Sequence, residues 1–320
     1  MKRIHPCILC FLFIVPAIRC QAQQPIISPD VHPDSRVTFR LRAPNAQKVM
    51  LAREGAEQIA MEKNEEGVWS IATDPLEPDI YGYSFVADGV NRDFFVYTPP
   101  GHDPKAAKTY PTLYLLHGFS DDASAWTAVG CAERILDNLI AQGKARPMLV
   151  IMPLGYGAPE IIARTGPGLH NHALRDRNCE KFRDALLTEV MPEVERWYLV
   201  ARDRESRAIA GLSMGGTESL FTGLNVLDGF AWVGVFSSGG LYESFDVMFP
   251  ALSSKVNTQL RLLWISCGKE DHLIEVNRKL IHWLDSKGIQ HTTIETSGSH
   301  TWMVWRRNLV SFVQLLFQER

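Results

Sequence analysis

Ser213 is the residue whose type and sequence context most clearly indicate nucleophilic catalysis. It lies in GLSMGG, directly after the apolar run RAIAGL and before a helical pattern that begins near Thr217. A serine between two glycines on a strand-to-helix turn is typical of a nucleophile elbow, because glycines let neighbouring backbone approach without a Cβ clash. Chance produces the short pattern in roughly one such chain in ten. The strand and helix around it therefore carry the prediction that Ser213 is a nucleophile.

An acid and a base are expected further along the chain. A serine hydroxyl needs a base to accept its proton and a third group to orient that base, and in such elbows the order is serine, acid, histidine. Asp271 follows the predicted strand LLWIS through a short loop, with the adjacent Glu270 as the alternative acid. His300, in SGSHTW, lies between the last predicted strand and the last predicted helix. We therefore predict Asp271 as the acid and His300 as the base.

Two backbone N–H groups are expected to stabilise the oxyanion that forms when the nucleophile attacks. Loss of one such donor typically costs on the order of 3 kcal/mol of barrier. Met214, immediately after the predicted nucleophile, is one candidate, and Phe119, in the loop LLHGFS after an early strand, is the other. The alternative for His117-Gly118 in that loop is a simple strand-ending turn.

Tryptophans and histidines near these motifs are candidates for ligand binding. Trp126 follows the predicted oxyanion loop, and Trp302 and Trp305 lie beside His300. We predict these three as substrate-binding residues for a flat or sugar-like group, with core packing as the alternative. The HNH sequence at 170–172 has two histidines without a third nearby ligand, so we expect no metal there. The predicted chemistry requires neither a metal nor an organic cofactor.

The elements that position these residues fall into two regions. From about 36 to 90, short runs rich in Val, Phe, Trp and Tyr predict a small antiparallel sandwich without helices. After YTPPGHDP (97–104), apolar strands alternate with helices, which predicts a mostly parallel, doubly wound sheet with helices on both faces. The strands are expected at 112–118, 147–153, 207–213, 232–238, 260–268 and 291–296. The helices are expected at about 128–142, 178–198, between the last two strands, and at 304–317.

Composition and the N-terminus narrow the possible partners and compartment. The net charge of −3 gives no electrostatic reason to expect nucleic acid as a partner. A basic start followed by the apolar run CILCFLFIVPAI predicts a signal peptide over 1–22, with export to the periplasm or medium and no integral membrane segment after cleavage. A lipoprotein anchored through Cys20 is the alternative, which Arg19 disfavours. Cys131, Cys179 and Cys267 remain after cleavage, and we expect free thiols with at most one bridge.

The motifs together resemble a known enzyme family. YTPPGHDP, YPTLYLLHGFSDDASAW, DNLIAQGKARPMLVIMP, AIAGLSMGG and SGSHTWMVWRRNL are similar to the esterase-D-like, family 1 carbohydrate esterases, from about residue 94 to the C-terminus. The preceding segment resembles the immunoglobulin-like early-set domain related to glycogen-binding modules. The resemblance implies an α/β-hydrolase over 93–320, preceded by a sandwich over 23–92. It implies the same three roles for Ser213, Asp271 and His300.

The resemblance also implies a substrate class. Feruloyl and acetylxylan esterases belong to this family, so the expected reaction is hydrolysis of feruloyl or acetyl esters on plant polysaccharide. Alternatives are another acyl substrate (a siderophore ester, or acyl transfer to a sugar) and an inactive, glycan-binding hydrolase fold. The N-terminal domain is expected to brace the esterase, with glycan binding as the alternative.

Two departures from the family pattern stand out. Gly298-Ser299-His300 replaces the usual Gly-Gly-His. FVADGV also runs into NRDFFVYTPPG with almost none of the linker and opening sheet strand typical of relatives, which puts the domain boundary near 91–96 and the edge of the sheet in doubt.

Overall fold

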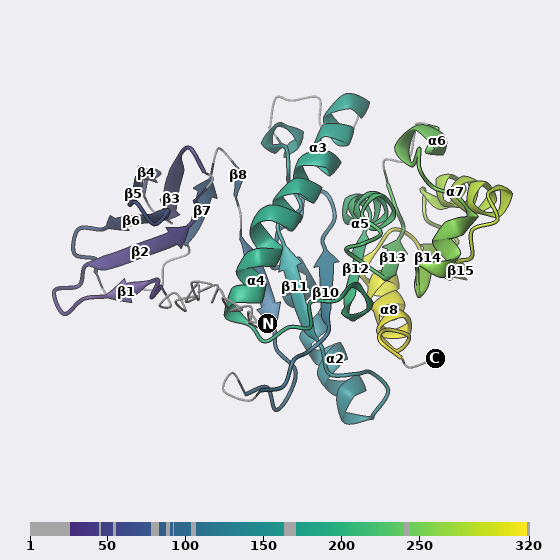
Figure 1. The fold of residues 1–320 in the computed structure, drawn as a ribbon, viewed down its shortest axis with the longest axis horizontal. Helices are drawn as coiled ribbons and strands as arrows, with labels where there is room; N and C mark the ends of the chain where they lie inside the picture. The colour runs from purple at the N-terminus through teal and green to yellow at the C-terminus, as the bar shows by residue number, and fades with distance from the viewer. Residues whose placement is uncertain are drawn as a thin grey trace, which may run out of the picture.

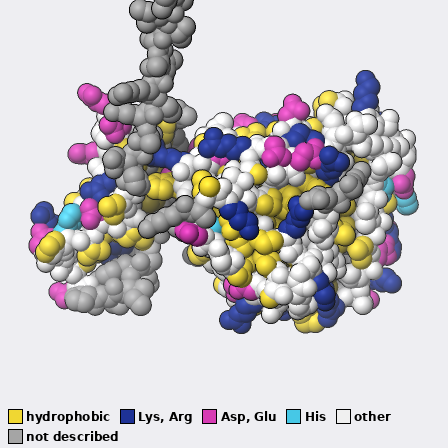
Figure 2. All heavy atoms as spheres, turned by 60° about the horizontal axis from the view of Figure 1, so that its bottom comes forward, with side chains coloured by type: hydrophobic (Ala, Val, Ile, Leu, Met, Phe, Trp, Pro, Cys, Tyr) yellow, Lys and Arg dark blue, Asp and Glu magenta, His cyan; other side chains and the backbone are white. Residues whose placement is uncertain are grey.

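The computed structural model describes residues 26–44, 46–53, 56–77, 83–87, 90–91, 93–103, 107–162, 171–239 and 244–318. The predicted signal peptide at 1–22 lies outside these ranges. Within them, strands form a seven-stranded sheet and two four-stranded sheets. Figure 1 shows the small sheets to one side of the large sheet, and the space-filling view shows them as a separate lobe (Figure 2).

The strands of the described residues are β1 (Asp30–Val31), β2 (Val37–Arg42), β3 (Val49–Arg53), β4 (Ile59–Ala60), β5 (Glu62–Lys63), β6 (Val68–Ala72), β7 (Tyr83–Ala87), β8 (Val90–Asn91), β9 (Phe94–Tyr97), β10 (Thr112–Leu116), β11 (Leu149–Pro153), β12 (Arg207–Leu212), β13 (Trp232–Phe236), β14 (Leu262–Gly268) and β15 (Thr292–Thr296). The α-helices are α1 (Ala125–Ala128), α2 (Ala132–Ala141), α3 (His172–Ala185), α4 (Met191–Trp197), α5 (Met214–Asn225), α6 (Phe245–Met248), α7 (Ile274–Ser286) and α8 (Trp302–Val313).

The N-terminal lobe is a two-sheet sandwich, as predicted. One sheet has the order β1-β2-β6-β5 and the other β4-β3-β7-β8, with antiparallel pairing throughout the described strands. Side chains from both sheets, including Phe39, Leu51 and Trp69, form one buried cluster between them. The predicted boundary between residues 92 and 93 falls between β8 and β9, and it stays a prediction.

The large sheet has the order β15-β14-β13-β12-β10-β11-β9. Its strands are parallel except for β9, which pairs antiparallel with β11 and forms one edge. β9 lies in the segment where the shortened linker raised doubt about the sheet, so an opening strand is present there. The mostly parallel α/β fold that the alternating pattern predicted is confirmed.

Helices cover both faces of this sheet, because residues along each strand alternate between two apolar clusters. In β10, Tyr114 and Leu116 face the cluster that contains side chains of α3, α4, α5 and α7. Leu113 and Leu115 face the other cluster, which contains side chains of α2 and α8. With both faces covered, the strands β10 to β14 are buried almost along their whole length, which explains their continuous apolar sequences, whereas the edge strands β9 and β15 are partly exposed.

Helix boundaries differ from the predictions where polar or irregular positions intervene. The helix expected at 178–198 begins at His172, because the Asn171 side chain caps it by accepting from the Leu174 N–H at 3.0 Å. A π turn over Leu186–Val190 separates α3 from α4. The helix expected at 128–142 begins only at Ala132, since Cys131 has a φ of 52° and interrupts the pattern, and the short α1 before it ends at Ala128.

Candidate active site

Ser213 lies on a strained turn at the carboxyl end of β12, where α5 begins. Its φ of 52° and ψ of −115° are unfavourable for a residue with a side chain, at a cost of about 1–3 kcal/mol. Neighbouring backbone leaves no room for other side chains here. A Cβ on Gly211 would lie 2.4 Å from the Gly215 carbonyl oxygen, and one on Gly215 would lie 2.3 Å from the His117 carbonyl oxygen. The glycines of GLSMGG are therefore steric requirements of the turn.

Three predicted side chains form a continuous hydrogen-bonded chain. The His300 Nε2 lies 3.0 Å from the Ser213 Oγ, and the His300 Nδ1 lies 2.9 Å from the Asp271 Oδ2. The strand ends bring them together, since Asp271 follows β14 and His300 follows β15 at the same edge of the sheet as Ser213. Glu270, the alternative acid, instead accepts from the Gly298 N–H at 2.5 Å.

The environment of Asp271 keeps its carboxylate charged. Burial raises its pKa, but hydrogen bonds from His300 and from the Leu273 N–H outweigh burial and leave the pKa below its usual value. The Leu273 N–H donates to Oδ1 at 2.9 Å, which fixes the carboxylate on the side opposite the imidazole. A charged acceptor at Nδ1 requires that this nitrogen carry a proton, so Nε2 is left to face the serine.

The loop that carries His300 tolerates the departure from the Gly-Gly-His pattern. Ser299 is exposed, whereas Gly298 has a φ of 119° and its Cβ position would lie 2.6 Å from the Val304 side chain. A Cβ on Gly268 would lie 2.0 Å from the Gly298 carbonyl oxygen. The glycine that the conformation requires is therefore retained, and the substituted position points to solvent.

The two predicted oxyanion donors lie on either side of the serine. Met214 is the first residue of α5, where a backbone N–H has no acceptor within the helix and the helix dipole favours negative charge. Phe119 follows Gly118, whose Cβ position would lie only 3.4 Å from the Ser213 Cβ and 2.7 Å from the Leu212 Cδ1. The loop after β10 therefore packs directly against the elbow.

His117 attaches this loop to the next one, a role that the sequence did not reveal. Its side chain is 1% exposed, its Nδ1 lies 2.7 Å from the Gly118 carbonyl, and its Nε2 lies 2.9 Å from the Gly155 N–H. The N–H of Gly155 can only donate and the carbonyl can only accept, so His117 is neutral with its proton on Nδ1. Burial likewise lowers its pKa. Tyr156 adds a second link by donating to the Asp121 carbonyl at 3.0 Å.

Asn178 and Glu218 extend this network beneath the serine. The Asn178 side chain accepts from the Ala158 N–H at 2.9 Å and donates to the Glu218 Oε1 at 2.7 Å. Burial raises the pKa of Glu218 well above its usual value, although the hydrogen bond from Asn178 opposes the shift. Glu218 is fully buried, so a polar contact shielded from solvent joins α3 and α5.

Two of the three predicted substrate-binding tryptophans are buried in the protein interior. Trp126 is 1% exposed and donates to the Leu116 carbonyl at 2.9 Å, so its burial contradicts a place on a substrate surface. Trp305 is 6% exposed, and its ring meets that of His300 edge to face with centroids 4.8 Å apart. Trp302 is partly buried between these two rings. The three rings pack against one another, because Trp302 contacts both Trp126 and Trp305.

A pocket of about 120 Å³ opens beside Ser213. One wall comes from α3, another from α5, and a third from the residues after Asp271. Its lining residues are Ile161, Arg175, Asn178, Cys179, Ser213, Met214, Thr217, Gly239, His272 and Leu273. The sequence offered no signal for the α3 residues, since a helical spacing of polar side chains is usually a solvated face.

In the described part of the chain, potential metal ligands converge beside Ser213. Among the described residues, one group of three such side chains comes together, namely Asp271, His272 and His300. Two of the three already bond each other, so we assign no metal to them. Cys131, Cys179 and Cys267 are free thiols.

Comparisons with known proteins agree with this fold. The family model Esterase ("Putative esterase") matches residues 87–316. An endo-1,4-beta-xylanase/feruloyl esterase of Xylanibacter ruminicola is 26% identical over 351 aligned positions, which cover 91% of this chain and 46% of that protein. An acetyl esterase of Caldicellulosiruptor saccharolyticus is 24% identical over 234 positions, covering 62% of this chain and 80% of that protein.

A solved structure shows the same architecture. The CE1 ferulic acid esterase of the anaerobic fungus Anaeromyces mucronatus superposes with a TM-score of 0.61 and 19% identity, covering 92% of this chain and 98% of that one. This chain spans less than half the length of the Xylanibacter relative. Because the family model covers well over half of the chain, the chain belongs to the Esterase family of α/β-hydrolase enzymes.

Proposed function

We propose that this protein is a serine esterase that hydrolyses feruloyl or acetyl esters on plant cell-wall polysaccharide through an acyl-enzyme. The observation that carries the proposal is the hydrogen-bonded chain from Ser213 through His300 to Asp271, at distances of 3.0 and 2.9 Å. The positive φ of Ser213 supports it, because such strain persists only where the surrounding structure enforces it.

In the proposed mechanism, His300 Nε2 accepts the Ser213 hydroxyl proton as the oxygen attacks the ester carbonyl. The N–H groups of Met214 and Phe119 stabilise the oxyanion. The imidazolium then protonates the departing alcohol oxygen, and the acyl group stays on Ser213. In the second half, His300 takes a proton from water, hydroxide attacks the acyl-enzyme, and Ser213 leaves with the proton. Asp271 holds the imidazole orientation and stabilises its cation throughout.

The substrate class rests on the relatives. Feruloyl esterase and acetyl esterase are the names of the two relatives described above, and the larger of these also carries an endo-xylanase name. The pocket of about 120 Å³ beside Ser213, which has a mostly apolar lining, offers space for part of such an ester. No metal or organic cofactor enters the proposed steps.

The decisive test compares wild type with Ser213→Ala on methyl ferulate and 4-nitrophenyl acetate. We expect the variant to lose turnover of both esters, and wild type to be labelled at Ser213 by a fluorophosphonate probe. Undiminished turnover by the variant would refute the proposal. Relative kcat/KM values for ferulate, acetate and siderophore esters identify the acyl group. A folded protein that the fluorophosphonate probe does not label would indicate an inactive glycan-binding protein.

We also propose that the protein is exported and that its sandwich braces the esterase domain. The basic, apolar N-terminus supports export, and in the part of the chain that the structure describes no helix is long and apolar enough to cross a membrane. Detection of a mature N-terminus after Ala22 in the periplasm or medium tests export. Retention of residues 23–92 on insoluble xylan would instead support the alternative that the sandwich binds glycan.

A further inference from the structure

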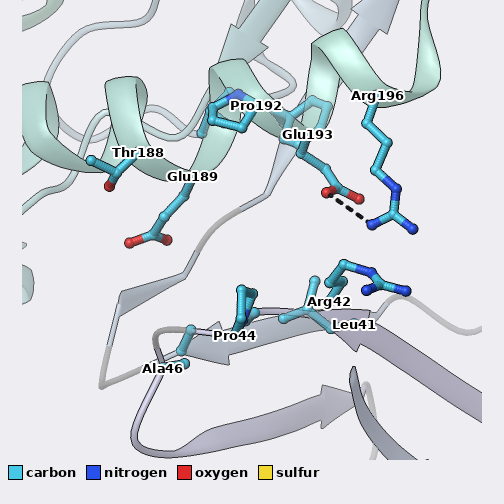
Figure 3. Close-up of a pocket in the computed structure, with 13 residues that line it drawn as sticks. Leu41, Arg42, Pro44, Ala46, Thr188, Glu189, Pro192, Glu193 and Arg196 are labelled. Carbon is cyan, nitrogen blue, oxygen red and sulfur yellow. Dashed lines mark ion pairs between the residues drawn. The ribbon is translucent and has the colours of Figure 1, made fainter. Parts of the chain in front are cut away.

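A cavity of about 310 Å³ lies between the sandwich and the helical side of the large sheet, away from Ser213. The sandwich contributes the end of β2 and the residues after it, and the other lobe contributes the π turn, α4 and Phe94 of β9. Figure 3 shows the side chains of Thr188, Glu189, Glu193 and Arg196 hanging from the helix toward the sandwich. Two separate folding units therefore enclose this space.

The sandwich wall is held in place by contacts inside its own lobe. The Ala43 carbonyl accepts from the Trp69 Nε1 at 2.9 Å, and the Ala43 N–H donates to the Gly67 carbonyl at 3.0 Å. The Lys63 Nζ donates to the Pro44 carbonyl at 2.5 Å. The wall is therefore formed before any ligand enters, which lowers the entropic cost of binding.

Hydrogen-bond donors at one end of the cavity have no acceptors. The Nη1 and Nη2 atoms of Arg196 and the Nε of Arg42 lack hydrogen-bond partners and are covered by neighbouring atoms, so both guanidinium groups must turn toward the cavity to bind a ligand. The Arg42 Nη1 donates to the Glu66 carbonyl at 3.4 Å. Arg196 forms an ion pair with the Glu193 carboxylate, whose Oε2 is 3.9 Å from Nη1 and too far to accept a hydrogen bond. Figure 3 shows the two guanidinium groups at the same end of the cavity.

The orientation of Arg196 leaves its donors pointing away from its own helix. Its guanidinium carbon lies 5.3 Å from the centre of the Trp197 ring, so the ring supports the flat face of the group. The N–H donors project from the edge, and two on one edge match the two oxygens of a carboxylate. Buried polar groups are otherwise almost always paired, so these donors indicate an acceptor supplied from outside.

The rest of the lining is largely apolar. Leu41, Pro44, Phe94 and Val190 contribute to it, and Glu189 and Glu193 place negative charge on the helix wall. Those two carboxylates disfavour a small, highly charged anion such as phosphate. A ligand with one carboxylate and an apolar body would accept hydrogen bonds from Arg196 and Arg42 and would cover the apolar lining. It would bring only a single negative charge near the two arginines.

We propose that this cavity is a binding site for a small monocarboxylic acid with a flat apolar body, its carboxylate on Arg196 and Arg42. The site is separate from the proposed esterase centre, and the proposal does not depend on ester hydrolysis. The acids that an aromatic-ester hydrolase releases belong to this chemical class.

The test is calorimetric titration of the full chain with sodium cinnamate and with the neutral cinnamamide. We expect a cinnamate site whose Kd rises at least about tenfold in Arg196→Gln, and cinnamamide to bind that site at least about tenfold more weakly, because charge-assisted hydrogen bonds are lost in both cases. Arg134→Gln is the matched control, since the Arg134 side chain is 79% exposed and lies outside the cavity. It should leave the Kd unchanged.

A second variant guards against misfolding of the first. Thr188 is exposed on the helix wall, and Thr188→Trp should fill the cavity without disturbing the core. Binding should fall in this variant while its thermal unfolding midpoint and its turnover of 4-nitrophenyl acetate match wild type. Cinnamate binding unchanged in both variants would overturn the proposal, and so would no binding at millimolar concentration. Tight binding of xylobiose that both variants abolish would assign the cavity to neutral sugar instead.

Discussion

Replacing His117 by leucine should damage catalysis without touching the substrate. Leucine fills most of the buried volume but removes both hydrogen bonds, so the Gly155 N–H and the Gly118 carbonyl lose their partners. Each unpaired buried group costs about 1–3 kcal/mol, so the free energy of unfolding should fall by about 2–6 kcal/mol. Because Phe119 follows Gly118 directly, displacement of its N–H should cost up to about 3 kcal/mol of barrier, about a hundredfold in kcat.

The assay is steady-state hydrolysis of 4-nitrophenyl acetate together with urea unfolding. We expect kcat to fall and KM to stay within about twofold, the pattern for an interaction made only in the transition state. His117→Gln should recover part of the stability, since the amide oxygen can accept from Gly155. His291→Leu is the matched control, because the His291 side chain is also largely buried, its Nδ1 donates to the Ile289 carbonyl at 2.8 Å, and it lies in a different loop.

The comparison of the two leucine variants decides the question. If His117→Leu loses stability but keeps wild-type kcat, the loop geometry does not depend on His117 and the reasoning is wrong. If His291→Leu loses kcat as strongly as His117→Leu, general destabilisation explains both.

Three further outcomes follow from the same site. Burial lowers the pKa of His117 below 6.5, so the unfolded chain binds a proton at a higher pH than the folded chain does. The free energy of unfolding should therefore fall as the pH drops below about 6.5 toward the folded-state pKa. Urea unfolding at a series of pH values should show a smaller slope in His117→Gln. Asp271→Asn should lower kcat by about 10³–10⁴-fold without changing the fold, since the amide no longer fixes the His300 tautomer. Steady-state kinetics check the loss of kcat, and circular dichroism checks the fold. Trp305→Phe removes the donor to Ser237 at 3.2 Å and should cost about 1–2 kcal/mol of stability while leaving KM unchanged; a raised KM alone would restore a substrate-binding role.

The sequence predicted the elements best where periodicity was strong. The parallel strands and the order of serine, acid and histidine could be read because strand ends share one edge of the sheet. The Ser213, Asp271 and His300 side chains do meet there, whereas their catalytic roles stay predictions. Trp126 and Trp305 proved to be buried, because nearness along the chain does not distinguish a pocket wall from a packed interior, and the predicted role of the partly buried Trp302 stays a prediction.

Other features had no local signal. His117 looks like any histidine before a glycine, and its role depends on Gly155, which is distant in sequence. Likewise Asn178 and Glu218 come from different helices, and their pairing depends on how those helices pack. The cavity between the lobes depends on the placement of two folding units, which no single segment encodes.

The connection between the lobes limits what the sandwich can do for the enzyme. Six residues separate Ala87 at the end of β7 from Phe94 at the start of β9, and two of them, Val90 and Asn91, pair back onto β7 as β8. Even fully extended, six residues span only about 20 Å. The connection is therefore too short for the sandwich to bind a substrate far from the esterase domain. It can act only within the footprint of the enzyme itself, and recombination that exchanged it for another module would have to preserve the contact surface as well as the chain.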